Sequence, residues 1–280
     1  MNDSWTMTTS LTPEQRLDVL NLLNRTEVLL GREAIDEGSR RIVVHGWRAE
    51  HWLVHRDGNL EGYALLTGSE QPTIEMCGGK FDQGLLDAVL EVHPQVDWWK
   101  RDSHLVEHGT VMRTLQMMRI RLPVDVLEVP AAATLRAFEP LCDEDTWLQQ
   151  NNAAFAHHPE QGAWLLGDLE ERINEPWFDP SGFLLLEIDG RLAASCWTKV
   201  HELHPDRFGE IYVISVHPDF QGRDLGRIMV TQGLASLRKK GVTSAVLFVD
   251  QSNAIAKKLY ESLGFAVERE DNLVRFSAAT

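Results

Sequence analysis

The amino-acid sequence predicts an α/β (α+β) protein made of two units in tandem, each a mixed and mostly antiparallel sheet flanked by helices. The chain has 280 residues, of which 43% are hydrophobic and 25% charged, so it is long enough for two domains of ordinary size. A hairpin pattern occurs twice, with turns at Asp57 and Asp189. Each hairpin follows a helical stretch and precedes a further strand and helix. This repetition indicates a duplicated α/β unit.

The first half opens with a helix and continues with a hairpin. Thr12 and Pro13 have the residue types of an N-cap and a first helical position, and leucines follow at helical spacing. Residues 51–54 and 63–66 are apolar strands that flank a turn at residues 56–59. A helix followed by a hairpin is therefore expected at the start of the chain.

The connection between the halves contains prolines and small residues, from Leu122-Pro123 to Val129-Pro130 and three alanines. Val124, Val126 and Leu127 also allow a strand here. We place the boundary near Pro130, which gives units of residues 1–130 and 131–280.

The second half repeats the order of elements in the first. Residues 183–186 and 192–197 form the second hairpin, and the β-branched and aromatic residues of 210–216 predict the next strand. A helix begins near Leu225, and residues 245–249 predict a buried strand.

The segment between the strand 210–216 and the helix at Leu225 has the composition of a phosphate site. It reads Phe-Gln-Gly-Arg-Asp-Leu-Gly over residues 220–226. A strand, a glycine-bearing turn and a helix N-terminus bring free N–H groups and the positive end of the helix dipole together. On its own, this segment is about as consistent with a structural turn as with a phosphate site.

These residues resemble the pyrophosphate loop of the GNAT acetyltransferase superfamily. Gln221 and Gly226 match the superfamily motif, whereas Asp224 stands where a glycine is usual. A carboxylate beside a diphosphate is unfavourable, so Asp224 is expected to face solvent or bond Arg223 or Arg227. A second superfamily string follows in the correct order and is filled by Asn253, Ala256, Tyr260, Gly264 and Phe265.

The second half also resembles the mycothiol synthase family, through long and unusual strings at residues 151–162, 175–180, 197–201 and 209–213. The resemblance implies a tandem GNAT enzyme that transfers an acetyl group from acetyl-CoA to the cysteinyl amine of 1-D-myo-inositol 2-(L-cysteinylamino)-2-deoxy-glucopyranoside. This is the last step of mycothiol biosynthesis in actinobacteria. Residues 131–280 are then the catalytic unit. Residues 1–130 lack both the glycine loop and the Tyr-x-x-x-Gly-Phe ending, so we interpret them as a degenerate, catalytically silent GNAT-like unit.

An amine is mostly protonated at neutral pH, so acetylation requires a base. Glu210 is our candidate, because it begins the strand beside the expected cofactor and alternation places it on one face with Tyr212 and Ile214. Tyr260 is the superfamily's usual proton donor to the leaving thiolate. The expected cofactor-binding residues are Ile214, Ser215, Val216, Gln221, Gly222, Arg223, Asp224, Leu225, Gly226, Asn253, Ala256 and Lys257.

The resemblance implies a set of residues that contact the amine substrate. They are Glu33, Glu160, Lys199, Glu210 and Phe248. Two of them carry a reservation: Lys199 taken alone is more typical of a solvated strand residue, and Phe248 replaces a tyrosine of the family.

Composition argues against several other classes of ligand. The net charge of −15 weighs against nucleic acid or anionic membrane as partners, and no apolar run approaches a membrane span. Cys77, Cys142 and Cys196 are few and dispersed, as expected of buried thiols in a cytoplasmic protein. We predict no metal, since the adjacent His157 and His158 cannot easily face one ion. A monomer is expected.

Two other functions remain open from the residues alone. The first is acetylation of another small amine, such as an aminoglycoside or polyamine, or of a protein N-terminus. The second is a non-catalytic acyl-CoA-binding sensor, which the departures at Asp224 and Phe248 keep open.

Overall fold

The computed structural model describes residues 3–68, 70–101, 109–156, 163–202 and 207–278. Its strands form one twelve-stranded sheet in the order β1-β2-β3-β4-β5-β12-β6-β11-β10-β9-β8-β7. Among the strand pairs of these described residues, only β4/β5 and β10/β11 are parallel. The strands are β1 Asp3–Thr8, β2 Glu50–Arg56, β3 Asn59–Thr67, β4 Thr73–Cys77, β5 Gln95–Lys100, β6 Thr110–Arg121, β7 Ala133–Ala137, β8 Phe183–Ile188, β9 Arg191–His201, β10 Phe208–Val216, β11 Ser244–Asp250 and β12 Ala266–Ser277.

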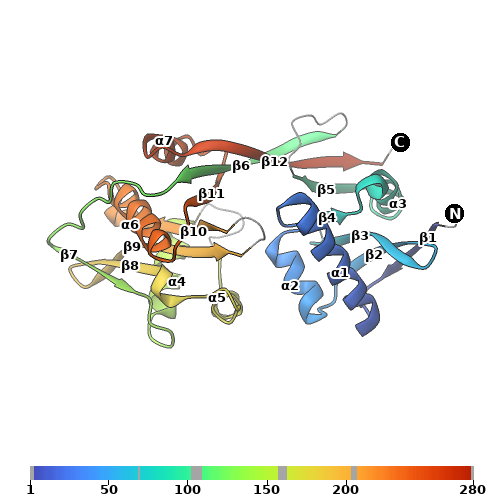
Figure 1. Ribbon diagram of the computed structural model, residues 1–280, viewed down its shortest axis with the longest axis horizontal. Coiled ribbons are helices and arrows are strands. Elements are labelled where there is room, and N and C mark those ends of the chain that lie inside the picture. The colour runs from blue at the N-terminus through green and yellow to red at the C-terminus, as the bar shows by residue number, and fades with distance from the viewer. Residues whose placement is uncertain (1–2, 69, 102–108, 157–162, 203–206, 279–280) are drawn as a thin grey trace.

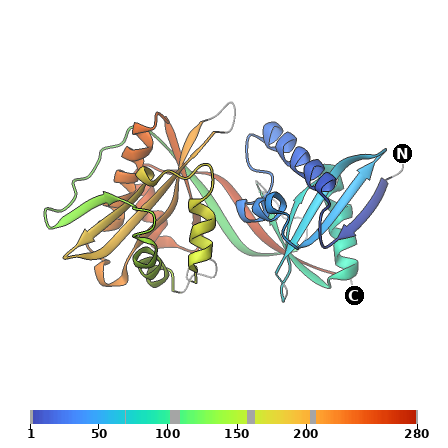
Figure 2. The same cartoon turned by 90° about the horizontal axis from the view of Figure 1, so that it is seen from below.

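Helices cover both faces of this sheet in two lobes (Figures 1 and 2). One lobe contains β1 to β5 with the first three helices, and the other contains β7 to β11 with the last four. The helices are α1 Pro13–Leu30, α2 Glu37–His45, α3 Asp82–Val92, α4 Glu144–Ala154, α5 Leu166–Ile173, α6 Leu225–Lys239 and α7 Ala254–Ser262. The mixed, mostly antiparallel sheet and its flanking helices confirm the predicted fold class.

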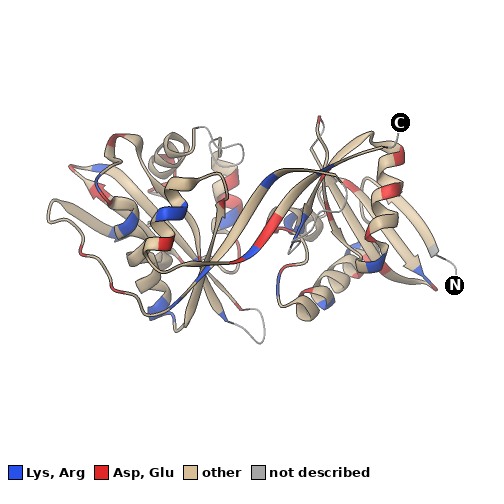
Figure 3. Cartoon of the chain, turned by 90° about the horizontal axis from the view of Figure 1, so that it is seen from above, with Lys and Arg blue, Asp and Glu red and all other residues tan. Residues whose placement is uncertain are grey.

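Two long strands, β6 and β12, join the lobes across the top of the molecule in Figure 1. β12 lies between β5 and β6, and β6 in turn pairs with β11. A strand from before Pro130 thus completes the sheet of the second half, and the last strand along the sequence extends the sheet of the first. β12 carries charges of both signs, whereas the charged residues of β6 are all arginines (Figure 3). The division of the chain at Pro130 stays a prediction.

The elements expected in the first half are confirmed in detail. Thr12 caps α1 by accepting a hydrogen bond from the Gln15 backbone, Gln15 returns the bond, and Pro13 occupies the first turn. The hairpin of β2 and β3 turns at Asp57 and Gly58, with φ of 49° and 84°. Both values lie in the left-handed region that this tight turn requires.

Each lobe has a core on both faces of its sheet. In the second lobe, α6 and α7 cover one face, and α4 with α5 covers the other around the buried Trp147 and Trp197. The connection after β6 forms no strand; Leu127 instead exchanges hydrogen bonds with the side chains of Thr231 and Gln232 on α6. The strand that remained possible at residues 124–127 is therefore absent from the described structure.

Strand β10 is interrupted by a bulge and then separates from β11. The register with β9 shifts between Ile211 and Val213. β10 and β11 pair only at Gly209 and Glu210, although both strands continue for several residues. Past Glu210, the edge of β10 that faces β11 therefore has no strand partner within residues 207–278.

Candidate functional site

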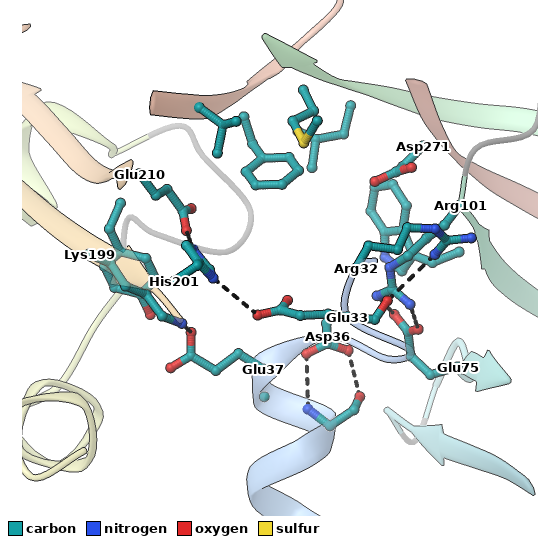
Figure 4. Close-up of a pocket in the computed structure, with 18 of the residues that line it drawn as sticks. Arg32, Glu33, Asp36, Glu37, Glu75, Arg101, Lys199, His201, Glu210 and Asp271 are labelled. Carbon is teal, nitrogen blue, oxygen red and sulfur yellow. Dashed lines mark hydrogen bonds and ion pairs between the residues drawn. The ribbon is translucent and has the colours of Figure 1, made fainter. Parts of the chain in front are cut away.

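A cavity of about 1060 Å³ lies between the two lobes, beneath the strands that join them. Its described walls come from the α1–α2 loop and α2 on one side, and from β9, β10 and β11 on the other (Figure 4). Four of the predicted site residues line it: Glu33, Lys199, Glu210 and Phe248. Glu160, His157 and His158 lie outside the described residues.

Glu210 lies at the point where β10 and β11 part, with 8% of its surface exposed. Its Oε2 is 2.5 Å from Nε2 of His201. Tyr212 lines the cavity beside it, as predicted, but Ile214 packs against the core under α6. The prediction that Ile214 shares a face with Glu210 is wrong, because the bulge reverses the alternation.

Lys199 is buried, with 7% of its surface exposed. Its Nζ lies 2.9 Å from Oε2 of Glu37 and over the rings of Trp177 and Tyr212, at 4.6 and 5.6 Å from their centroids. Burial lowers the pKa of Lys199, but Glu37, Glu210 and Glu33 outweigh it and hold the pKa above its ordinary value. The solvated-residue interpretation of Lys199 is wrong.

Glu33 reaches the same cavity from the first half, with its Oε1 4.0 Å from Nδ1 of His201. Burial raises the pKa of Glu33, against the attraction of Lys199 and His201. The side chain still keeps 42% of its surface open, so this desolvation is partial. Phe248 is 39% exposed and presents its ring to the cavity, where the Arg269 guanidinium lies 6.0 Å from its centroid.

The cavity is acidic. Among its described lining residues, nine are aspartate or glutamate and six are lysine or arginine. Several of the acids are paired: Glu75 receives two hydrogen bonds from Arg101, at 2.6 and 2.9 Å. The excess of carboxylates favours an ammonium group over an anion as the guest.

The glycine-bearing turn adopts the geometry of an anion site at the N-terminus of α6. Gly222 and Asp224 have φ of 74° and 58°. The Asp224 side chain makes no capping bond to the helix; it is exposed and lies 3.3 Å from Nε of Arg227. Backbone N–H groups of the first helical turn are therefore left for a ligand. Glycine is usual at position 224 because the left-handed conformation disfavours most side chains, although aspartate tolerates it.

Gly226 lies where the turn, the end of β10 and α7 come together. A Cβ on Gly226 would lie 3.4 Å from Leu259 of α7 and 3.8 Å from Val216 of β10. Arg227 also donates a hydrogen bond of 2.8 Å to Ser262. The turn, the end of β10 and α7, each of which carries predicted cofactor residues, thus pack against one another at Gly226.

Several predicted cofactor residues have other partners in the structure. Asn253 caps α7 by accepting from Ala256 N at 3.1 Å, and the hydroxyl of Ser215 bonds Gln150 and Ser195 in the opposite core. Val216 packs under α6, while Arg223 lies over Phe220. Leu225 is buried, and Gln221, Ala256 and Lys257 are not. Only their backbone or exposed atoms remain for a ligand.

Tyr260 is not among the described residues that line the cavity. It is 8% exposed and packs against Phe265 in the core shared by α6, α7 and β11. Burial raises the pKa of Tyr260 to about 12, so its hydroxyl stays protonated at neutral pH. Its proposed role as an acid stays a prediction.

The structure adds residues that the sequence did not single out. His201 bridges two carboxylates, and Glu37 holds Lys199. His201 follows Lys199 by two positions in the strand, so the alternation of side chains could have placed both on one face. The sequence around Glu37 gives no indication of its role, because its partner Lys199 is 162 residues away. Trp47 and Trp99 also line the cavity. Cys142, expected to be buried, is exposed.

The described residues contain no group of three or more His, Cys, Asp or Glu arranged to hold a metal ion. Similarly, none of the helices within the described ranges is both long and apolar enough to cross a bilayer.

The relatives of this sequence identify its family. Residues 142–265 match the model of the acetyltransferase (GNAT) family. The chain is 37% identical to the mycothiol acetyltransferase of Streptomyces coelicolor over 289 residues, which are 95% of this chain and 93% of that protein. The chain belongs to the mycothiol acetyltransferase family. It is an acetyltransferase of the GNAT type, and GNAT enzymes use acetyl-CoA.

Another member of the mycothiol acetyltransferase family matches over part of the chain. The protein of that name from Thermomonospora curvata is 52% identical over 157 residues, or 55% of this chain and 52% of the relative. Among solved structures, a tandem GNAT protein from the clavulanic acid pathway matches with a TM-score of 0.72 at 13% identity, covering 100% of this chain and 99% of that one. A GCN5-related N-acetyltransferase from Sphaerobacter thermophilus matches with a TM-score of 0.68 at 19% identity, covering 98% and 95%. These two likenesses support the fold.

Proposed function

We propose that this chain transfers the acetyl group of acetyl-CoA to the cysteinyl amine of 1-D-myo-inositol 2-(L-cysteinylamino)-2-deoxy-glucopyranoside, the last step of mycothiol formation. The observation that carries the proposal is the position of Glu210, which lies in an acidic cavity at the point where β10 and β11 separate. We also propose that the chain acts as a monomer in the cytoplasm.

The cofactor fits the second half on two grounds. The turn at residues 221–226 offers backbone N–H groups at a helix N-terminus, which suit a diphosphate. Val216, beside that turn, is six residues along β10 from Glu210, or roughly 20 Å at the rise of a strand. An extended arm is therefore required between a phosphate at the turn and an amine at Glu210, and the unpaired edge of β10 lies along this path.

When bound, acetyl-CoA supplies an activated acyl group, and the chain supplies the remaining functions. Glu210 accepts a proton from the ammonium of the substrate, which makes the amine a nucleophile. Lys199, Glu33 and Glu160 bind hydroxyl groups of the sugar and inositol, while Phe248 adds an apolar wall. Tyr260 donates a proton to the leaving thiolate.

We further propose that the first half has no catalytic role and supplies one wall of the cavity. Its glycine turn after β4 contains Gly79, with φ of 55°, and leads into α3. Burial raises the pKa of Asp82, at the start of α3, to about 6, although hydrogen bonds from Gly78 and Gly79 oppose the rise. This carboxylate competes with any phosphate for the backbone of the turn.

Release of CoA by the purified chain tests the proposal. We expect turnover with the cysteinyl pseudodisaccharide, and none with glucosaminyl-inositol, which lacks the cysteinyl amine. Free cysteine, an aminoglycoside and a polyamine serve as competing amines. Faster turnover with one of these would identify a different substrate, and binding of CoA without turnover on any amine would refute the proposal.

A further inference from the structure

Arg101 and Glu75 form an ion pair on the side of the cavity that the first half supplies (Figure 4). Two hydrogen bonds of 2.6 and 2.9 Å join the guanidinium to the carboxylate, and a third, of 3.1 Å, runs from Nη1 of Arg101 to the backbone oxygen of Ala34. We propose that this pair is a positioning unit, which fixes the α1–α2 loop so that the side chain of Glu33 faces the substrate. The inference rests on the proposed role of Glu33 in binding the amine substrate.

The pair bridges two strands beyond the end of their backbone pairing. Within the described residues, the parallel ladder of β4 and β5 ends at Ile74 and Trp98. Glu75 is the next residue along β4, and Arg101 directly follows the last residue of β5. Side chains therefore link the two strands at this point, and the hydrogen bond to Ala34 extends the link to the loop.

The backbone next to Glu33 is held in place, and its side chain projects into the cavity. Ala34 is 5% exposed, and its backbone oxygen accepts the hydrogen bond from Arg101. Asp36 then caps α2. The Glu33 side chain, by contrast, is 42% exposed and points toward His201 across the cavity (Figure 4). The direction of this carboxylate is therefore set by the backbone that Arg101 holds.

Burial makes the geometry of the pair important. The side chains of Glu75 and Arg101 are 4% and 14% exposed, so water competes little for their hydrogen bonds. The planar fork of a guanidinium serves both oxygens of a carboxylate and a backbone carbonyl at once, which an ammonium does not. Without the fork, the loop gains conformations in which Glu33 turns away from the cavity. A substrate must then order the loop as it binds, which weakens binding without altering the chemical step.

Kinetics of Arg101→Lys tests the inference, because lysine keeps the charge and loses the fork. With the cysteinyl pseudodisaccharide as substrate, we expect the KM for the amine to rise about tenfold, while kcat and the KM for acetyl-CoA stay within about twofold. Glu75→Gln is a milder change that keeps the shape of the side chain, and it should raise the same KM about threefold. It carries the test if Arg101→Lys does not fold. Wild-type KM values in the folded variants would overturn the inference.

A double variant tests whether Arg101 acts through Glu33. Glu33→Gln alone should raise the KM for the amine about tenfold. Since the loop matters to binding through Glu33, adding Arg101→Lys to Glu33→Gln should raise this KM by less than about twofold more. If the two effects multiply, Arg101 acts on the substrate or on the cavity independently of Glu33, and the inference fails.

A matched control exists in the same lobe. Arg275 donates two hydrogen bonds of 2.7 Å to Asp97, and neither residue is among the described residues that line the cavity. Arg275→Lys removes the same fork from a similar pair and should keep both KM values of the wild type. An equal rise in the KM for the amine in both arginine variants would indicate a general structural effect and would count against the inference.

Hydrogen exchange, measured without turnover, separates this inference from the proposed function. The backbone amides of residues 33–36 should exchange about tenfold faster in Arg101→Lys than in the wild type, and at the wild-type rate in Arg275→Lys. If their exchange is unchanged in Arg101→Lys, the pair does not hold the loop and the inference fails, whatever the substrate. If wild-type protein acetylates no amine but the exchange responds, the proposed function fails and the anchoring of the loop by Arg101 stands.

Discussion

Lys199 of β9 and Glu37 of α2 form an ion pair across the two halves of the chain, with 2.9 Å between Nζ and Oε2. A second pair between the halves joins Arg41 of α2 to Glu171 of α5, at 3.8 Å. Both contacts lie in the walls of the cavity. A substrate that binds Lys199 must therefore share this ammonium with Glu37 or displace it.

Glu37→Gln should destabilise the protein by about 2 kcal/mol, because it leaves a buried ammonium with a weaker set of partners. Lys199→Met in the same background should recover part of this loss. Urea unfolding of the two single variants and the double variant measures the coupling. Additive losses would show that the ion pair contributes nothing to stability.

Glu210→Gln should lower kcat by about 100-fold or more while the Kd for acetyl-CoA stays nearly constant, since the amide cannot accept the substrate's proton. Steady-state kinetics and a binding titration measure the two quantities. Glu187→Gln, in a carboxylate that pairs with Arg136 away from the cavity, is the control. Full activity of Glu210→Gln would exclude Glu210 as the base.

Asp224→Gly should tighten acetyl-CoA binding by roughly fivefold at low salt, because it removes a negative charge beside the turn that receives the diphosphate. The gain should shrink at high ionic strength. Asp189→Gly is the control: Asp189 has a similar φ of 51° but occupies a hairpin turn. Equal gains in both variants would point to backbone conformation rather than charge.

Tyr260→Phe should lower kcat about tenfold and change the free energy of unfolding by less than about 1 kcal/mol. The hydroxyl is protonated at neutral pH and makes no hydrogen bond to another described residue, so its loss removes a donor without breaking a contact. Turnover and thermal unfolding of the variant test this. An unchanged kcat would mean that water, and not Tyr260, protonates the leaving thiolate.

Asp143→Asn should cost on the order of 1–3 kcal/mol of stability at pH 7. Asp143 receives hydrogen bonds from Arg136 at 2.5 and 2.7 Å, and they hold the pKa of this carboxyl below its ordinary value. A lowered pKa in the fold stabilises the protein above the unfolded pKa, and the contribution is lost as pH falls through the folded value. Wild type and variant should converge in acid. Urea denaturation from pH 7 to pH 2.5 measures the free energies of unfolding of both proteins. A difference between them that stays constant over this range would contradict the prediction.

Local signals in the sequence were sufficient for the elements and for part of the site. Thr12, Asp57 and Gly58 predict a cap and a turn because their conformations depend on adjacent residues. Gln221 to Gly226 predict an anion turn for the same reason.

Features that depend on distant partners were beyond the sequence. β6 completes the sheet of the second half and β12 extends the sheet of the first. This arrangement requires pairing between residues far apart in the sequence, such as Gln116 and Glu270, which are 154 residues apart. The bulge at Tyr212 interrupts the alternation of side chains along β10 and places Ile214 on the opposite face of the sheet from Glu210. Burial of Lys199 depends on Trp177 and on Glu37 from the other half, neither of which periodicity can place.

The position of β12 between β5 and β6 has a consequence for synthesis on the ribosome. Most of the first lobe emerges early, yet the edge of β5 stays open until the last strand has left the exit tunnel. A chain truncated before Ala266 would expose that edge to other molecules, and an N-terminal fragment expressed alone would be prone to aggregation.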